Sequence, residues 1–162
     1  MKETKVKICG VSDVTSALEA QKCGADYIGL VFCKKSERCI SVEQANEIIL
    51  ALKSNISVVA LFSNDEEDYV KSTMNNIKVD LIQFHGDEKD ENCIKYNLPY
   101  FKGISSKNNN NEDLDNKYPN AAAFIIDSHD NDGLGGTGEI FDWTQNSFNT
   151  IKPIIIAGGL NC

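Results

Sequence analysis

The sequence predicts an α/β fold in which parallel strands alternate with helices, and two observations carry this prediction. Seven short apolar runs rich in β-branched residues recur along the 162-residue chain, and the segments between them are long enough to form helices. These runs are apolar at successive positions rather than at alternate ones, as expected for strands of a parallel sheet buried under helices. The predicted strands span residues 6–9, 27–32, 57–62, 80–85, 100–104, 123–127 and 153–157.

Capping residues indicate where the helices begin and end. Polar side chains that can cap a helix N-terminus follow the strands at Ser12 or Asp13, Ser41, Ser63 or Asn64, Asp87 and Asp142. Ser41 with Gln44, and Ser63 with Glu66, have the spacing of a capping box. Gly24 is expected just past the end of the first helix, where the chain must turn into the second strand.

The alternation of strands and helices is typical of a TIM (β/α)₈-type barrel, a fold that usually takes about 250 residues. The sequence ends at the exit of the seventh predicted strand. We therefore predict one domain over residues 1–162 that forms an incomplete barrel of about seven strands. Two sheet edges would then lack a partner, so we also expect the isolated chain to self-associate, aggregate or be molten.

Composition excludes several classes of function. The net charge of −8, without a long basic block, argues against nucleic acid and anionic membranes as partners. No apolar run is long enough to span a membrane, and the six cysteines form no C-x-x-C pair, so we expect a cytoplasmic protein with free thiols. The two histidines, His85 and His129, lie too far apart in the pattern to suggest a metal site, and the asparagine-rich segment 105–113 is interpreted as a solvated loop.

Two chemically capable side chains stand at predicted strand exits. Cys9 ends the first strand before Gly10, and Asp127 ends the sixth. Strand exits of a parallel α/β fold open on the face that carries active sites, so a thiol and a carboxylate there can act as general base and general acid. In an eight-stranded ring the first and sixth strands would face each other across the mouth. The competing interpretations are core packing for the cysteine and a helix cap or loop contact for the aspartate.

Other candidates lie on the loops that follow the strands. Gly158 and Gly159 follow the seventh strand, where barrels of this kind often bind phosphate, although a plain turn would also use glycine. The glycine-rich segment 133–138 is a second candidate for an anion-binding loop or a lid. Arg38 is a candidate to bind a carboxylate, with a surface arginine as the alternative, and His85 is interpreted as a structural histidine at the rim.

Taken together, the strand-end motifs resemble the phosphoribosylanthranilate isomerase family in both sequence and order, over essentially the whole chain. The motifs are Lys7-Ile8-Cys9-Gly10, Gly29-Leu30-Val31-Phe32 followed by Lys35-Ser36 and Arg38, Gln83-Phe84-His85-Gly86, Asp127-Ser128, Gly135-Gly136-Thr137-Gly138 with Phe141-Asp142-Trp143, and Gly158-Gly159-Leu160-Asn161.

The resemblance implies an Amadori rearrangement in tryptophan biosynthesis, on a phosphorylated small-molecule substrate and without metal or organic cofactor. In this family pattern Cys9 matches the general base and Asp127 the general acid. Arg38 matches the residue that holds the anthranilate carboxylate, and Gly158 and Gly159 match one half of the phosphate cradle.

The chain also departs from the family pattern. Cys33-Lys34 and Cys39 replace aromatic and proline residues expected beside the anthranilate pocket, and Cys162 replaces a proline. The eighth strand of the family is not part of this sequence. Two alternatives therefore stay open: a catalytically incompetent barrel or fragment that needs additional chain or self-association, and a related sugar-phosphate barrel enzyme, which the Cys9 motif disfavours.

Overall fold

The computed structural model describes residues 4–105, 113–127 and 148–158. Seven strands occur within these ranges: β1 (Lys7–Cys9), β2 (Tyr27–Val31), β3 (Ser57–Phe62), β4 (Leu81–Phe84), β5 (Tyr100–Ser105), β6 (Ala123–Asp127) and β7 (Ile154–Ala157). The helices are α1 (Val14–Lys22), α2 (Val42–Ala51), α3 (Glu67–Asn76), α4 (Asp90–Cys93), the 3₁₀ helix η1 (Ile94–Tyr96) and α5 (Leu114–Lys117).

The strands follow one another in sheet order from β1 to β7, and the pairs β1–β2, β2–β3, β5–β6 and β6–β7 are parallel. This arrangement confirms the predicted parallel α/β fold, and each predicted strand lies within one or two residues of an observed one. The chain divides into two compact units, Met1–Ile82 and Gln83–Cys162, which are described separately below. The single-domain organisation stays a prediction.

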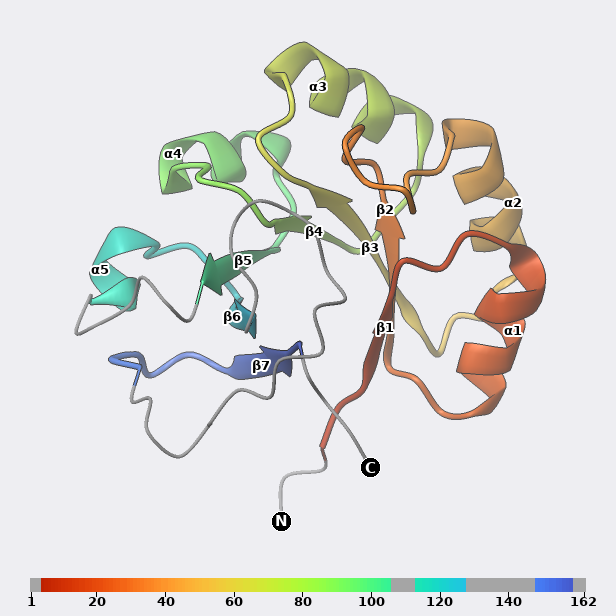
Figure 1. Cartoon of the computed structure of the whole chain (residues 1–162), viewed down its shortest axis with the longest axis horizontal. Helices are drawn as coiled ribbons and strands as arrows, with labels where there is room; N and C mark the ends of the chain where they lie inside the picture. The colour runs from red at the N-terminus through yellow and green to blue at the C-terminus, as the bar shows by residue number, and fades with distance from the viewer. Residues whose placement is uncertain (1–3, 106–112, 128–147, 159–162) are drawn as a thin grey trace. The chain divides into compact units, whose positions relative to one another are not determined.

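In the first unit, helices α1, α2 and α3 lie along the outer side of the strands (Figure 1). Strand β2 is buried on both faces, with Ile28 and Leu30 fully buried and Val31 nearly so. The helices contribute small or branched residues to the same core, including Ala17 of α1 and Ile48 of α2. The successive apolar positions of this strand thus have the two-sided burial that the pattern predicts.

Three of the predicted helix boundaries are confirmed. The backbone N–H of Ser16 donates to Oδ1 of Asp13 at 2.8 Å, and Ser41 and Gln44 form a reciprocal capping box with bonds of 2.9 and 3.2 Å. At the end of α1, Gly24 adopts φ of +87°. Its N–H donates to the Gln21 carbonyl at 3.1 Å and the next N–H donates to the Ala20 carbonyl at 3.0 Å, which completes a Schellman motif.

Two predicted helix starts are wrong, and a third lies outside the described residues. Helix α3 begins after Glu66, not after Ser63 or Asn64, because Oδ2 of Asp65 accepts the Ser63 N–H at 3.0 Å and Asn64 turns the chain with φ of +53°. This local side-chain bond competes with a cap and delays the helix. Helix α4 begins after Lys89 rather than at Asp87, and neither helix has a side-chain cap. Asp142 is not described.

The first and last strands are less buried than the pattern predicts. Ile8 on β1 is 42% exposed, and Ile154 and Ile156 on β7 are 42% and 46% exposed. These two strands stand at the ends of the strand order, so among the described strands each has a neighbour on one side only. Self-association through these edges stays a prediction.

The second unit contains a buried lysine in the middle of β5. The Lys102 side chain is 1% exposed, and its Nζ donates to the carbonyl oxygens of Phe84 at 3.4 Å, Gly103 at 3.1 Å and Gly86. The Glu88 carboxylate lies 3.5 Å away. Burial lowers the pKa of Lys102, whereas the negative charge of Glu88 acts to raise it. The ammonium thus links β5 to the segment that follows β4.

Replacing Lys102 with methionine should lower the free energy of unfolding by about 3–5 kcal/mol, the usual effect of removing one partner of a buried ion pair. The substitution keeps the apolar stem but removes the donor that Nζ supplies to three carbonyl oxygens and to the Glu88 carboxylate. Urea denaturation measures the loss. The matched control is Lys117→Met, which removes an exposed ammonium 5.7 Å from the Tyr118 ring, and should cost less than about 1 kcal/mol. Equal losses in the two variants would contradict the structural role of Lys102.

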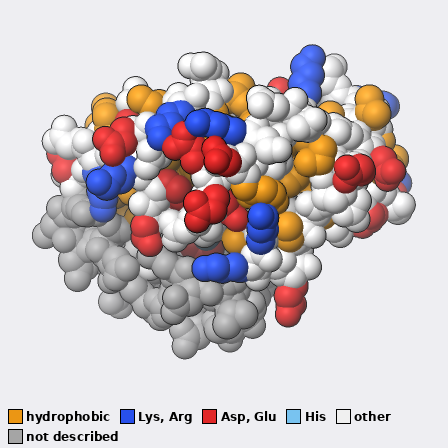
Figure 2. Space-filling model, turned by 90° about the horizontal axis from the view of Figure 1, so that it is seen from above, with side chains coloured by type: hydrophobic (Ala, Val, Ile, Leu, Met, Phe, Trp, Pro, Cys, Tyr) orange, Lys and Arg blue, Asp and Glu red, His pale blue; other side chains and the backbone are white. Residues whose placement is uncertain are grey.

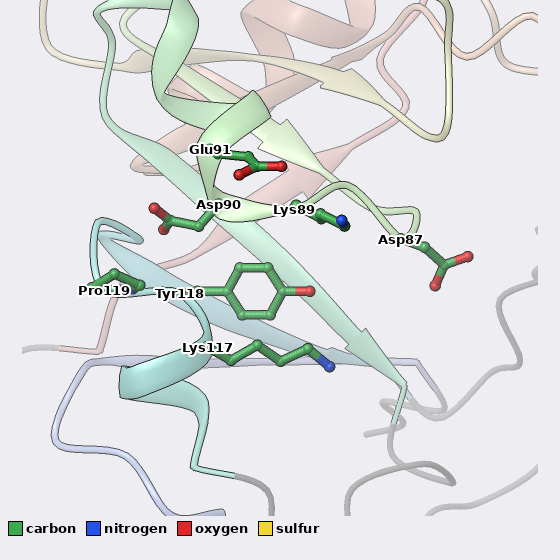
Figure 3. Close-up of a pocket in the computed structure, with 7 residues that line it drawn as sticks. All are labelled: Asp87, Lys89, Asp90, Glu91, Lys117, Tyr118 and Pro119. Atoms are coloured by element: carbon green, nitrogen blue, oxygen red, sulfur yellow. The ribbon is translucent and has the colours of Figure 1, made fainter.

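A surface hollow of about 600 Å³ lies near the buried Lys102 side chain. Figure 3 shows its lining, which comes from the segment that starts α4 and from the end of α5: Asp87, Lys89, Asp90, Glu91, Lys117, Tyr118 and Pro119. Tyr118 packs its ring centroid 5.4 Å from the Lys102 Nζ. Asp90 is fully engaged, because it accepts hydrogen bonds from the Tyr100 hydroxyl and from the backbone and side chain of Asn120.

Charged side chains of both signs share the molecular surface. On the face shown in Figure 2, lysine and arginine side chains are interspersed with acidic ones among the described residues. In the ranges that the structure describes, no helix is long and apolar enough to cross a membrane.

Candidate active site

Cys9 lies at the C-terminal end of β1, as predicted, and two glycines shape its surroundings. Gly10 turns the chain with φ of +83°, and its N–H donates to the Gly29 carbonyl at 2.9 Å. Gly29 of β2 is aligned with Cys9, and a Cβ at this position would lie 2.7 Å from the Cys9 Sγ. The missing side chain at position 29 therefore provides the space in which the thiol lies.

Lys7 approaches the same glycine. A Cβ at Gly29 would lie 2.9 Å from the Lys7 Nζ. The ammonium and the Cys9 thiol therefore both lie next to Gly29, on the same side of β2. The alternation of a strand places residues 7 and 9 on one side of β1. The structure thus places a positive charge beside the sulfur.

Arg38 is brought to Cys9 by the loop after β2. This loop folds back on itself, because Ile40 N–H donates to the Val31 carbonyl at 2.9 Å and Val31 forms a bridge with Cys39. The Arg38 Nη1 donates to the Cys9 carbonyl at 3.2 Å, and the side chain remains exposed. The first unit therefore places a thiol, an ammonium and a guanidinium close together around the C-terminal end of β1.

The Arg38 side chain crosses directly over Gly10. A Cβ at this position would lie 2.6 Å from Nη1 and 2.7 Å from Cδ. We therefore expect Gly10→Ala to displace the guanidinium and to raise the KM for an anionic substrate by about 10- to 100-fold, equivalent to one charged hydrogen bond of about 1.5–3 kcal/mol.

Gly24→Ala is the matched control, because Gly24 has a similar φ of +87° but nothing within 4 Å of the added methyl group. Steady-state kinetics should show a changed KM in the first variant alone, whereas both lose stability through backbone strain. An unchanged KM in Gly10→Ala would mean that substrate binding does not depend on the observed position of the Arg38 side chain.

The departures from the family pattern lie on the same loop as Arg38. Cys33 is buried, and Lys34 places its Nζ 4.0 Å from the centroid of the Tyr69 ring. The Tyr69 hydroxyl donates to the Phe32 carbonyl at 3.0 Å. Cys39, the third of these departures, has a thiol whose pKa is raised by burial. Lys34 is thus engaged with α3 through Tyr69.

Asp127 ends β6, as predicted, and its partner in the second unit is a histidine. The register aligns Asp127 with Ser105 of β5 and with Ala157 of β7. Oδ2 of Asp127 lies 3.5 Å from Nε2 of His85, and the two side chains are 23% and 30% exposed. The interpretation of His85 as a rim histidine with a polar partner agrees with this contact.

Gly158 follows β7 immediately after the residue aligned with Asp127 and has φ of +79°. Asp127 and the backbone of Gly158 therefore stand at neighbouring strand exits in the second unit. Gly159, the glycine-rich segment 133–138, and the motif residues 128, 141–143 and 160–161 lie outside the described residues. The expected meeting of Cys9 with Asp127 stays a prediction, because the two residues belong to different units.

Gln83 and Gly103 were not among the candidates from the sequence, although both contact His85. Nε2 of Gln83 lies 3.2 Å from Nδ1 of His85, and a Cβ at Gly103 would lie 2.5 Å from that nitrogen. The sequence did offer one indication of the first contact: Gln83 is a polar residue in an apolar run, two positions before His85, and residues two apart in a strand lie on the same face.

Thiols other than Cys9 have different surroundings. Burial raises the pKa of Cys93 to about 12, so its thiol is inert at neutral pH. Cys23 is exposed at the end of α1. In the described ranges, no group of three or more histidine, cysteine, aspartate or glutamate residues is placed to hold a metal ion.

Comparisons with known proteins agree with this geometry. A family model described as N-(5'phosphoribosyl)anthranilate (PRA) isomerase matches residues 6–162. The N-(5'-phosphoribosyl)anthranilate isomerase of Pseudomonas syringae pv. syringae (strain B728a) is 40% identical over 161 residues, which cover 99% of this chain and 78% of that protein. The enzyme of the same name from Hahella chejuensis is 38% identical, with 99% and 76% covered.

Solved structures show the same relationship. The phosphoribosyl anthranilate isomerase of Thermus thermophilus has a TM-score of 0.82 at 28% identity, over 97% of this chain and 78% of that one. A phosphoribosyl anthranilate isomerase in complex with reduced 1-(o-carboxyphenylamino)-1-deoxyribulose 5-phosphate has a TM-score of 0.74 at 26% identity, over 98% and 77%.

The parallel strands with polar residues at their exits define an α/β protein of the TIM-barrel class. The family-model match over residues 6–162 and the 40% identity to the enzyme of Pseudomonas syringae narrow this class to one family. The chain belongs to the N-(5'phosphoribosyl)anthranilate (PRA) isomerase family.

Proposed function

We propose that this chain catalyses the conversion of N-(5′-phosphoribosyl)anthranilate to 1-(2-carboxyphenylamino)-1-deoxyribulose 5-phosphate, an intramolecular oxidoreduction in tryptophan biosynthesis. The observation that carries the proposal is the family match over residues 6–162, within which Cys9, Arg38 and Asp127 stand at or just after strand exits. The reaction needs no external oxidant or reductant, because one carbon of the sugar is oxidised while its neighbour is reduced.

Asp127 and Cys9 divide the proton transfers in this proposal. Asp127 donates a proton to the furanose oxygen, the bond from this oxygen to C1′ breaks, and the nitrogen lone pair forms the Schiff base. Cys9 then removes the proton from C2′, and the electrons of that bond give the enolamine, which tautomerises to the aminoketone product. The partly exposed position of both residues at strand ends supports this assignment.

The remaining site residues bind the two anionic ends of the substrate. The exposed Arg38 guanidinium, held against the Cys9 carbonyl, can form paired hydrogen bonds to the anthranilate carboxylate. The turn at Gly158, together with Gly159, supplies backbone N–H groups for one half of a phosphate site. Within this proposal the enzyme uses no metal or organic cofactor and acts in the cytoplasm, where free thiols such as those found here persist.

One observation favours an alternative in which the chain is inactive until further chain or a second copy covers its edges. The isoleucines of β1 and β7 are more exposed than core strands allow, and an apolar strand edge is prone to associate. Under this alternative the residues of the site are intact but are not held in working positions by a single copy.

A fluorescence assay tests the proposal. Phosphoribosylanthranilate is made in situ from anthranilate, its loss is followed with increasing amounts of the chain, and the product is identified by mass after borohydride reduction. We expect a rate above the spontaneous background that is proportional to chain concentration. A rate equal to background at every concentration would contradict the proposal, and a rate per chain that rises with concentration would support the self-associated alternative.

A further inference from the structure

Three polar side chains form a line within the second unit. Gln83 lies in β4, His85 follows the end of that strand, and Asp127 ends β6. Nε2 of Gln83 is 3.2 Å from Nδ1 of His85, and Nε2 of His85 is 3.5 Å from Oδ2 of Asp127. The inner end of the line is buried, since Gln83 is 2% exposed, whereas the other two side chains reach the surface.

Strand β5 permits this line because it carries a glycine where the histidine ring lies. Strand β5 stands between β4 and β6 in the sheet order, and a Cβ at Gly103 would lie 2.5 Å from Nδ1 and 3.0 Å from Cγ of His85. Only a residue without a side chain leaves room for the imidazole over this strand. The ring is therefore held against the Gly103 backbone on its way from β4 toward Asp127.

The contact with Gln83 favours one position for the proton of His85. In the amide orientation that the structure gives Gln83, its nitrogen faces Nδ1 and its buried Oε1 has no partner among the described residues; because an amide nitrogen only donates, Nδ1 accepts in this arrangement and is unprotonated. A neutral imidazole then carries its proton on Nε2, the nitrogen that faces Asp127. His85 is in this way prepared to donate a hydrogen bond to Oδ2 of Asp127.

We propose that Gln83 is a positioning residue, which holds the proton of His85 on Nε2 so that His85 stabilises the carboxylate that Asp127 becomes after it donates its proton. The proposal rests on the proposed role of Asp127 as the general acid. A hydrogen bond to a carboxylate is stronger than one to a carboxylic acid, so the contact strengthens as the proton leaves Asp127. Such a contact favours the transition state over the bound substrate.

Nitrogen NMR of His85 tests the proposal without any need for turnover. The chain has two histidines, so His129→Gln in ¹⁵N-histidine-labelled protein leaves the signals of His85 alone. In neutral imidazole the chemical shifts separate the protonated from the unprotonated nitrogen. We expect a protonated Nε2 and an unprotonated Nδ1, and the opposite assignment would overturn the proposal.

Variants of Gln83 show whether this residue is the cause. Gln83→Glu replaces the donor with an acceptor, so we expect a proton on Nδ1 in the same background. Gln21→Glu adds the same charge at the end of α1, where the amide contacts Lys53 and Asn55, and should leave His85 unchanged. If Gln83→Glu leaves Nδ1 unprotonated, Gln83 does not control the tautomer.

Gln83→Met keeps the test decisive if the glutamate variant fails to fold, because it removes the donor without adding a charge. We expect the Nδ1-protonated form to become populated, and kcat to fall about 2- to 10-fold at unchanged KM, the equivalent of one neutral hydrogen bond. A wild-type tautomer in this variant would overturn the proposal. Full activity in Asp127→Asn would instead contradict the proposed role of Asp127 as the general acid. The NMR assignment of the His85 tautomer is independent of that result and tests the role of Gln83 by itself.

Discussion

Replacing Cys9 with serine should lower kcat for N-(5′-phosphoribosyl)anthranilate by about 10²- to 10⁴-fold, the usual contribution of a positioned general base. Serine keeps the size and polarity of the side chain in the space above Gly29, so the fold and substrate binding should be preserved. A serine hydroxyl, however, ionises far less readily than a thiol and is a poor base at neutral pH. We therefore expect the decrease in kcat to come from slower removal of the C2′ proton.

The control for this experiment is Cys23→Ser, which makes the same change at an exposed cysteine at the end of α1. Steady-state kinetics of the two variants, with thermal unfolding as a check on folding, separate the chemical effect from a general effect of losing a thiol. We expect Cys23→Ser to retain wild-type kcat. Turnover in Cys9→Ser within a few-fold of wild type would show that another group removes the proton.

The strand ends explain why much of the site could be predicted from the sequence. Cys9 and Asp127 stand at the ends of apolar runs, and the C-terminal ends of parallel strands are where folds of this class carry their active sites. Arg38 could be placed on the loop after β2 for the same reason. Its bond to the Cys9 carbonyl could not be predicted, because that contact depends on the fold of the loop between Val31 and Ile40.

Residues inside the predicted strands were harder to interpret. The run 100–104 was predicted as an apolar strand, and the strand is present, but Lys102 within it is buried against carbonyl oxygens contributed by a segment 16 to 18 residues earlier. The line from Gln83 to Asp127 likewise depends on the order β4-β5-β6 and on Gly103 between its members. Nothing local to Gln83 indicates that its amide meets a ring nitrogen.

Local competition explains the boundary that was wrong at α3. Ser63 and Glu66 have the spacing of a capping box, yet the Asp65 carboxylate takes the Ser63 N–H first. Capping-box spacing therefore identified α2, where Glu43 stands at the same offset as Asp65 but the Ser41 N–H donates to Gln44, and it failed one helix later. The same residue types thus give a cap or a turn, according to the residues that stand between them.

Asp127→Asn should lower kcat by about 10²- to 10⁴-fold with little change in KM, because an amide occupies the same volume but cannot donate a proton to the furanose oxygen. Asparagine can still accept a hydrogen bond from His85, so the contact between β4 and β6 should survive and the fold should be retained. Asp13→Asn is the control, since asparagine caps a helix as well as aspartate does and Asp13 stands at the start of α1.

Comparison with His85→Asn decides which member of this pair is the acid. If Asp127 donates the proton and His85 stabilises the carboxylate left behind, Asp127→Asn should lose much more activity than His85→Asn, and adding the second change to the first should cost little more. Two groups that serve one step are expected to be non-additive in this way. A larger loss in His85→Asn would transfer the role of the acid to the histidine, and the 3.5 Å contact would then position the imidazole rather than the carboxylate.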